Sequence, residues 1–137
     1  MKSFITALAL LLIATTSALA HSKMSGSTPS SGDTAEAGLE VLDLTFDRKV
    51  RLTRVDMHQA PEGMTLESVM KTMMEGQDHD IEGQAAVELT SDLPKSFVDE
   101  VSLGFSPLEA GVYMVHWIAV ALDGHTMEGD IHFAVSE

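Results

Sequence analysis

Two segments near the C-terminal end alternate apolar with other residues at a period of two, the pattern of half-buried β-strands. Between them lies Asp123-Gly124-His125-Thr126, which has the composition of a tight turn. The apolar positions are Tyr113, Val115 and Trp117 in the first segment and Ile131, Phe133 and Val135 in the second. Antiparallel pairing of the two triplets predicts a hairpin with Trp117 beside Ile131, Val115 beside Phe133, Tyr113 beside Val135, and His116 opposite His132 on the outer face.

The same alternation recurs upstream, which constrains the chain to an antiparallel β fold. The alternating sets are Leu42, Leu44 and Phe46, then Val50 and Leu52, then Val87 and Leu89, then Val101, Leu103 and Phe105. The phase has shifted by Val55 and Met57, which predicts a β-bulge after Leu52. Several short strands separated by turn residues predict an all-β sandwich or barrel.

One stretch, residues 64–75, departs from the β pattern. Leu66, Val69, Met70 and Met73 follow the i, i+3, i+4, i+7 spacing of an amphipathic helix, and Gly63 and Gly76 flank the stretch. The spacing predicts a short methionine-rich helix inserted between strands, with Met70 and Met73 on the buried face.

The first 20 residues have the three parts of a secretory signal: a positive Lys2, an apolar run from Phe4 to Ile13, and small residues at Ala18 and Ala20. The run is shorter than the roughly 20 apolar residues of a membrane span. We therefore expect cleavage after Ala20, export, and no membrane span in the mature chain. Residues 21–137 then form one domain that begins with an extended arm at 21–38, rich in small and polar residues.

Composition excludes some classes of function. Loss of Lys2 leaves 7 basic against 21 acidic residues, a net charge near −14, which makes nucleic acid an improbable partner. The chain has no cysteine, so neither disulfides nor thiolate metal sites are possible.

Cleavage after Ala20 would make His21 the first residue, where its α-amine and ring nitrogen can chelate one metal ion. Asp123 and His125, two residues apart in the predicted turn, offer a carboxylate oxygen and an imidazole nitrogen. The combined set of three nitrogens and one oxygen suits tetragonal Cu(II). An aspartate in a loop is more often a turn residue without a role in metal binding.

Several of these residues belong to a pattern that resembles the CopC family of copper-resistance proteins. The pattern comprises His21, Ser27-Thr28-Pro29, Leu44-Thr45-Phe46, Leu108-Glu109-Ala110-Gly111-Val112-Tyr113-Met114-Val115-His116-Trp117, Asp123-Gly124-His125, Gly129 and Phe133-Ala134-Val135. The resemblance implies an Ig-like Greek-key β-sandwich or barrel of about seven strands. It further implies a periplasmic Cu(II) protein whose ligands are His21, Asp123 and His125, and a separate inner-membrane transporter of the CopD type as partner.

The chain departs from the family in two places. Many members carry a second histidine two residues after the first, where this chain has Lys23, and the stretch over residues 57–83 is longer than usual. Some relatives bind Cu(I) through methionines, for which thioether sulfur is well suited. Packing is the favoured role of Met70 and Met73, which leaves Met57, His58, Met64, Met74 and His79 as candidates for a secondary Cu(I) site.

The sequence is compatible with three functions. The leading hypothesis is a copper-binding protein that buffers or carries Cu(II) and is not an enzyme. The second is a copper-dependent oxidative enzyme with an N-terminal histidine brace, and the third is a metal-free structural sandwich. Trp117 is expected in the core, and His116 with His132 as an exposed pair.

Overall fold

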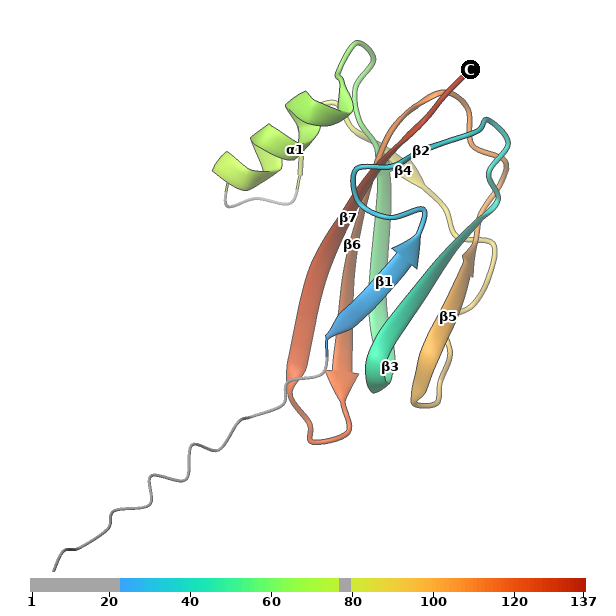
Figure 1. Ribbon diagram of the computed structural model, residues 1–137, viewed down its shortest axis with the longest axis vertical. Helices are drawn as coiled ribbons and strands as arrows, with labels where there is room; N and C mark the ends of the chain where they lie inside the picture. The colour runs from blue at the N-terminus through green and yellow to red at the C-terminus, as the bar shows by residue number, and fades with distance from the viewer. Residues whose placement is uncertain (1–22, 77–79) are drawn as a thin grey trace, which may run out of the picture.

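The computed structural model describes residues 23–76 and 80–137 (Figure 1). These residues form seven strands and one short helix. The elements are β1 (Met24–Thr28), β2 (Thr34–Ala35), β3 (Val41–Gln59), α1 (Leu66–Glu75), β4 (Ala85–Val87), β5 (Val98–Gly104), β6 (Gly111–Ala121) and β7 (Thr126–Val135). The helix of this part of the chain is too short and too polar to cross a membrane.

The long strand β3 joins two layers. Its first half pairs with β1 and β5, and its second half, from Val50, pairs with β6 and β4. In Figure 1 the first half descends and the second half returns upwards, so the chain turns near residues 47–49. The predicted bulge is confirmed between Leu52 and Arg54. Strands β6 and β7 extend the second layer, and β2 joins β7 in parallel. The expected β-sandwich is confirmed.

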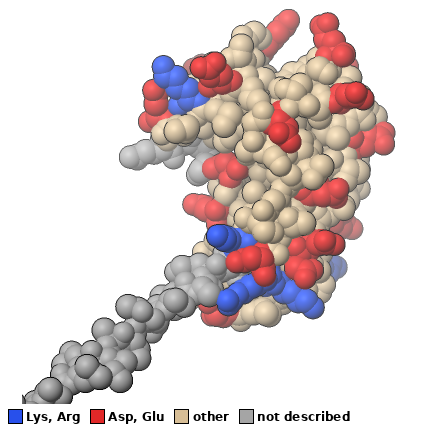
Figure 2. All heavy atoms as spheres, viewed as in Figure 1, with Lys and Arg blue, Asp and Glu red and all other residues tan. Residues whose placement is uncertain are grey.

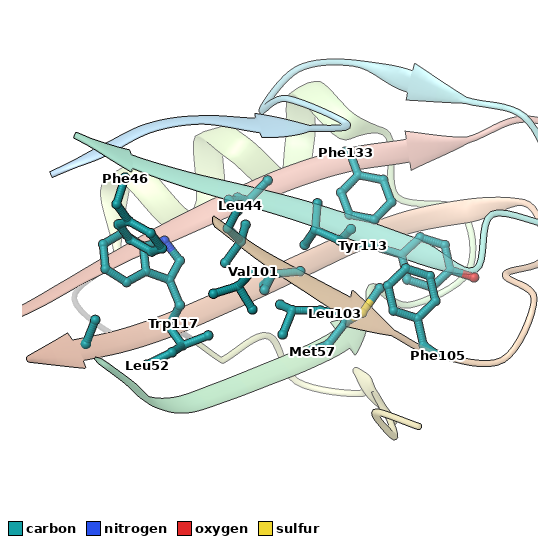
Figure 3. Close-up of a cluster of buried hydrophobic side chains, with 14 of the residues drawn as sticks. Leu44, Phe46, Leu52, Met57, Val101, Leu103, Phe105, Tyr113, Trp117 and Phe133 are labelled. Carbon is teal, nitrogen blue, oxygen red and sulfur yellow. The ribbon is translucent and has the colours of Figure 1, made fainter. Parts of the chain in front are cut away.

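The inward-facing residues of both layers form one apolar core (Figure 3). Leu42, Leu44 and Phe46 are buried, as their alternation predicts. Phe46 and Trp117 meet edge to face at one end of the core, with ring centroids 5.3 Å apart. Each such side chain stabilises the fold by about 1.5–3 kcal/mol through burial. Trp117 is 4% exposed, so its predicted place in the core is confirmed.

The predicted register of the last hairpin is wrong by two residues. Tyr113 pairs with Phe133 and Trp117 pairs with Gly129, so the partner of Trp117 on β7 has no side chain. A Cβ atom at Gly129 would lie 2.6 Å from Trp117 Cζ2, which shows that the ring occupies the space above the glycine. A shift by two preserves which residues face the core, and it changes every cross-strand partner. His116 therefore faces Asp130, and His132 pairs with Met114.

The predicted helix is confirmed as α1. Thr65 caps it: the Thr65 hydroxyl accepts a hydrogen bond from the Ser68 N–H, and the Ser68 hydroxyl accepts one from the Thr65 N–H. Val69 is fully buried against the outer face of the second layer, and Met73 packs beside it. Met70 differs from the prediction, because it is only half-buried and borders an open apolar groove.

Removal of this cap should loosen the helix. Thr65→Ala deletes the hydroxyl that accepts from Ser68, and such a loss costs about 1 kcal/mol of helix stability. Faster amide hydrogen exchange in α1 is the expected result. Thr72→Ala is the matched control, because the exposed Thr72 hydroxyl only donates to the Ser68 carbonyl within the helix. Equal exchange in the two variants would show that the capping box contributes nothing.

Candidate metal centre

The loop between β6 and β7, residues 122–125, is closed by two backbone hydrogen bonds. The Gly124 N–H donates to the Ala121 carbonyl at 3.0 Å, and the Ala121 N–H donates to the His125 carbonyl at 2.9 Å. Gly124 has φ +86°, a left-handed conformation that side chains disfavour. The glycine therefore allows the sharp turn that brings its two neighbours, Asp123 and His125, to the same side of the loop.

Asp123 and His125 contact each other directly. Asp123 Oδ1 accepts the His125 backbone N–H at 3.0 Å, and Asp123 Oδ2 lies 2.8 Å from His125 Nδ1. The hydrogen bond from the imidazole holds the pKa of the Asp123 carboxyl below its usual range, so the group is a carboxylate at neutral pH. When Nδ1 donates, the neutral ring has its lone pair on Nε2, the atom then able to bind a metal ion. Both side chains are exposed, at 56% and 61%.

The described chain begins at the same end of the sandwich as this loop. The Lys23 N–H donates to Asp47 Oδ1 at 2.7 Å, and the Asp47 N–H donates to the Lys23 carbonyl at 3.0 Å. A few residues after Asp47, Val50 pairs with Ala121, the last residue of β6 before the loop. His21 itself lies outside the described residues.

Asp123 and His125 supply only part of a coordination sphere. Within residues 23–76 and 80–137, no three His, Asp or Glu side chains gather closely enough to hold a metal ion. A complete site at the loop therefore needs donors from elsewhere. Figure 2 shows acidic side chains scattered over the viewed face, in keeping with the acidic composition.

The candidates for a secondary Cu(I) site do not form one cluster. Met57 was expected to be free and is instead 3% exposed in the main core, because neighbouring strand residues face opposite sides of β3. His58, the next residue, is half-buried on the other face. Met64 is half-buried near α1 and Met74 is 84% exposed. His79 lies outside the described residues.

The sequence reasoning missed a polar cluster on the outer face of β6 and β7. His116 Nδ1 lies 2.9 Å from Asp130 Oδ1, and His116 Nε2 lies 3.5 Å from Glu128 Oε2. The predicted partner of His116 was His132, and the two-residue shift in register replaces it with Asp130. The alternation showed that these residues face outwards but could not show which of them meet.

The fold and the loop define a small β-sandwich domain with an exposed carboxylate–imidazole pair at one end. Residues 24–136 match the model of the CopC domain, so the chain belongs to the CopC family. It is 31% identical over 137 residues to copper resistance protein C of Pseudomonas syringae pv. tomato, a match that covers 97% of this chain and 94% of the relative.

Solved structures of related proteins share the fold. PcoC, a methionine-rich copper resistance protein from Escherichia coli, superimposes with a TM-score of 0.56 at 24% identity, over 85% of this chain and 100% of PcoC. CopC from Methylosinus trichosporium OB3b gives 0.55 at 19% identity, over 85% and 94% of the two chains.

Proposed function

We propose that this protein is exported to the periplasm and binds Cu(II) there, buffering or carrying the ion for resistance or uptake. The observation that carries the proposal is the Asp123–His125 pair, held by a closed loop at the end of the sandwich where the described chain begins. The chain belongs to the CopC family, and its relatives in Pseudomonas syringae and Escherichia coli are named copper resistance proteins.

The proposed ligands are the amine and ring of His21, the carboxylate of Asp123 and the imidazole of His125. Cleavage after Ala20 would free the His21 amine, which is why export and binding belong to the same proposal. Three nitrogens and one oxygen favour tetragonal Cu(II) over harder cations. Asp123 is ionised at neutral pH and His125 lies beside it, so one loop supplies both a carboxylate and an imidazole donor.

Binding and transfer fit this ligand set better than catalysis. A copper enzyme that activates oxygen leaves a coordination position open for its substrate. In the proposed site the Asp123 carboxylate occupies such a position. A protein that carries copper has to transfer the ion to another protein. The proposed recipient is a separate inner-membrane transporter of the CopD type.

Loss of either loop ligand should change the copper site without unfolding the protein. Asp123→Ala and His125→Ala are each expected to alter the Cu(II) electron paramagnetic resonance spectrum and weaken binding, because each removes one donor. The fold should survive, since both side chains are more than half exposed. Glu128→Ala, with an exposed carboxylate on β7 beyond the loop, is the control and should keep the parent spectrum. Unchanged spectra in both loop variants would reject this assignment.

A further inference from the structure

The basic residues of this acidic chain gather at the end of the sandwich that carries the β6–β7 loop. Val50 pairs there with both Ala121 and Val98, so the end comprises residues 23–24, 46–51, 94–99 and 120–126. It holds five of the 7 basic residues of the mature chain but only three of its 21 acidic residues. The five are Lys23, Arg48, Lys49, Arg51 and Lys95. Figure 2 shows Lys and Arg side chains gathered at the lower end of the molecule. We call this net-positive region the basic end.

The positive charges of the basic end are available to a partner. All five basic residues are exposed, and within the described part of the chain Arg48, Lys49 and Lys95 take part in no ion pair. The Arg51 guanidinium lies 5.6 Å from the centroid of the Phe97 ring, which directs it across the same end. Two of the three carboxylates already accept hydrogen bonds: Asp47 from the Lys23 N–H and Asp123 from His125.

An exposed apolar side chain projects from the same surface. Leu122 is the first residue after β6 and is 68% exposed. A single exposed leucine is common on protein surfaces and by itself indicates nothing. Here, however, it begins a projecting loop at the centre of the positive charge. Apolar residues flanked by lysine and arginine are typical of surfaces that bind anionic bilayers, because the apolar group enters the headgroup layer while the cations contact lipid phosphates.

The composition of the basic end favours a lipid surface over a protein partner. Protein interfaces have a core of aromatic, methionine and arginine side chains and contain few lysines. The basic end has three lysines, and Leu122 is its only exposed large apolar residue among the described residues. The acidic remainder of the molecule does not prevent approach to an anionic surface. Strand β6 has 11 residues and is about 36 Å long, whereas screening in physiological salt acts over about 8 Å.

We propose that the basic end docks onto an anionic lipid bilayer, with Leu122 among the headgroups and Arg48 and Lys49 against lipid phosphates. The charge complementarity of this end with phosphate headgroups carries the proposal. It rests on the proposed function only in placing the protein beside the inner membrane. Docking in this orientation turns the loop of Asp123 and His125 towards the bilayer. The copper site would then face the membrane in which the proposed recipient lies.

Co-sedimentation of the metal-free mature protein with vesicles tests the charge requirement. Binding is expected to equal parts of phosphatidylglycerol and phosphatidylcholine, but not to phosphatidylcholine alone. It should be lost in about 1 M salt, where the screening length falls to about 3 Å. Arg48→Gln combined with Lys49→Gln should weaken binding about 25-fold, because each basic residue near an anionic surface contributes a factor of about five. Lys71→Gln is the matched control on α1, at the opposite end in Figure 1, and should bind like the parent.

Two tryptophan substitutions report which end meets the bilayer. In Leu122→Trp the new indole should enter the headgroup layer, so its fluorescence should shift to shorter wavelength when anionic vesicles are added. Met74→Trp is the control, because Met74 is 84% exposed on α1 and should stay in water. The native Trp117 is 4% exposed in the core and should give a constant background in both variants.

Equal vesicle binding by the parent and the Arg48/Lys49 double variant would overturn the proposal, as would a fluorescence shift in Met74→Trp without one in Leu122→Trp. Absence of vesicle binding would also overturn it, including the case in which the basic end binds only an acidic protein. These measurements use no copper, and the Cu(II) titrations use no lipid. Failure of lipid docking therefore leaves Cu(II) binding by the loop unaffected, and failure of Cu(II) binding leaves lipid docking unaffected.

Discussion

One glycine placed ahead of His21 is expected to weaken Cu(II) binding by the mature protein by about 100-fold or more. The extension keeps the imidazole but moves the terminal amine out of the chelate ring. The His21 ring nitrogen then binds Cu(II) without the help of the amine. In the processed chain the amine holds the same ion and so raises the effective concentration of the ring nitrogen. The measurement is a competitive Cu(II) titration of the two chains at one pH.

Two controls show whether the amine itself is responsible. His21→Ala keeps a free terminus and removes the ring, so it should also weaken binding. Lys23→Ala changes a nearby residue that the proposal does not use, and it should have no effect. Affinity in the glycine-extended chain equal to that of the processed chain would rule out chelation by the terminal residue.

The second large effect is expected in the core, where Gly129→Ala should destabilise the fold by about 1–3 kcal/mol. The added Cβ would lie 2.6 Å and 2.8 Å from two carbons of the Trp117 indole. The ring is buried against Phe46 and has little room to move away. Chemical denaturation of the variant and the parent measures the loss.

A second strand glycine provides the matched control. Gly26→Ala places its Cβ 3.3 Å from Thr45 Oγ1, a side-chain atom that can rotate away, so a much smaller loss is expected. Trp117→Phe in the Gly129→Ala background should recover part of the loss, because a smaller ring leaves space for the methyl group. If Gly129→Ala is as stable as the parent, the observed register of the hairpin is incorrect.

The strand pattern predicted the fold class, the bulge in β3 and the buried faces, because each depends only on local periodicity. The same periodicity cannot distinguish registers that differ by two residues, since both bury the same side chains. The choice between the two registers depends on the space available to the Trp117 ring of β6, which packs over Gly129 of β7. The helix was predictable for the same local reason, although Met70 borders a groove instead of the cluster beneath α1.

The candidate metal sites also differ in how far the sequence alone could predict them. Asp123 and His125 are neighbours in one turn, so the sequence alone could indicate that they meet, and their contact is observed. Met57 was misjudged because a shift in strand phase decides whether it faces the core or solvent, and it faces the core. A row of His58, Met114 and His132 spans β3, β6 and β7, and α1, β4 and β5 separate β3 from the other two strands along the chain. Such a row can be recognised only after the register is known.

Counting the imidazoles on bound Cu(II) tests the central proposal most directly. Mature protein that starts at His21, loaded with one equivalent of Cu(II), would be measured by pulsed electron paramagnetic resonance, which detects the remote nitrogen of each coordinated histidine ring. We predict two coordinated rings in the parent, one in His125→Ala, and one in His21→Ala. Two rings remaining in both variants, or no Cu(II) retained by the parent, would contradict binding by the terminal histidine and the Asp123–His125 loop.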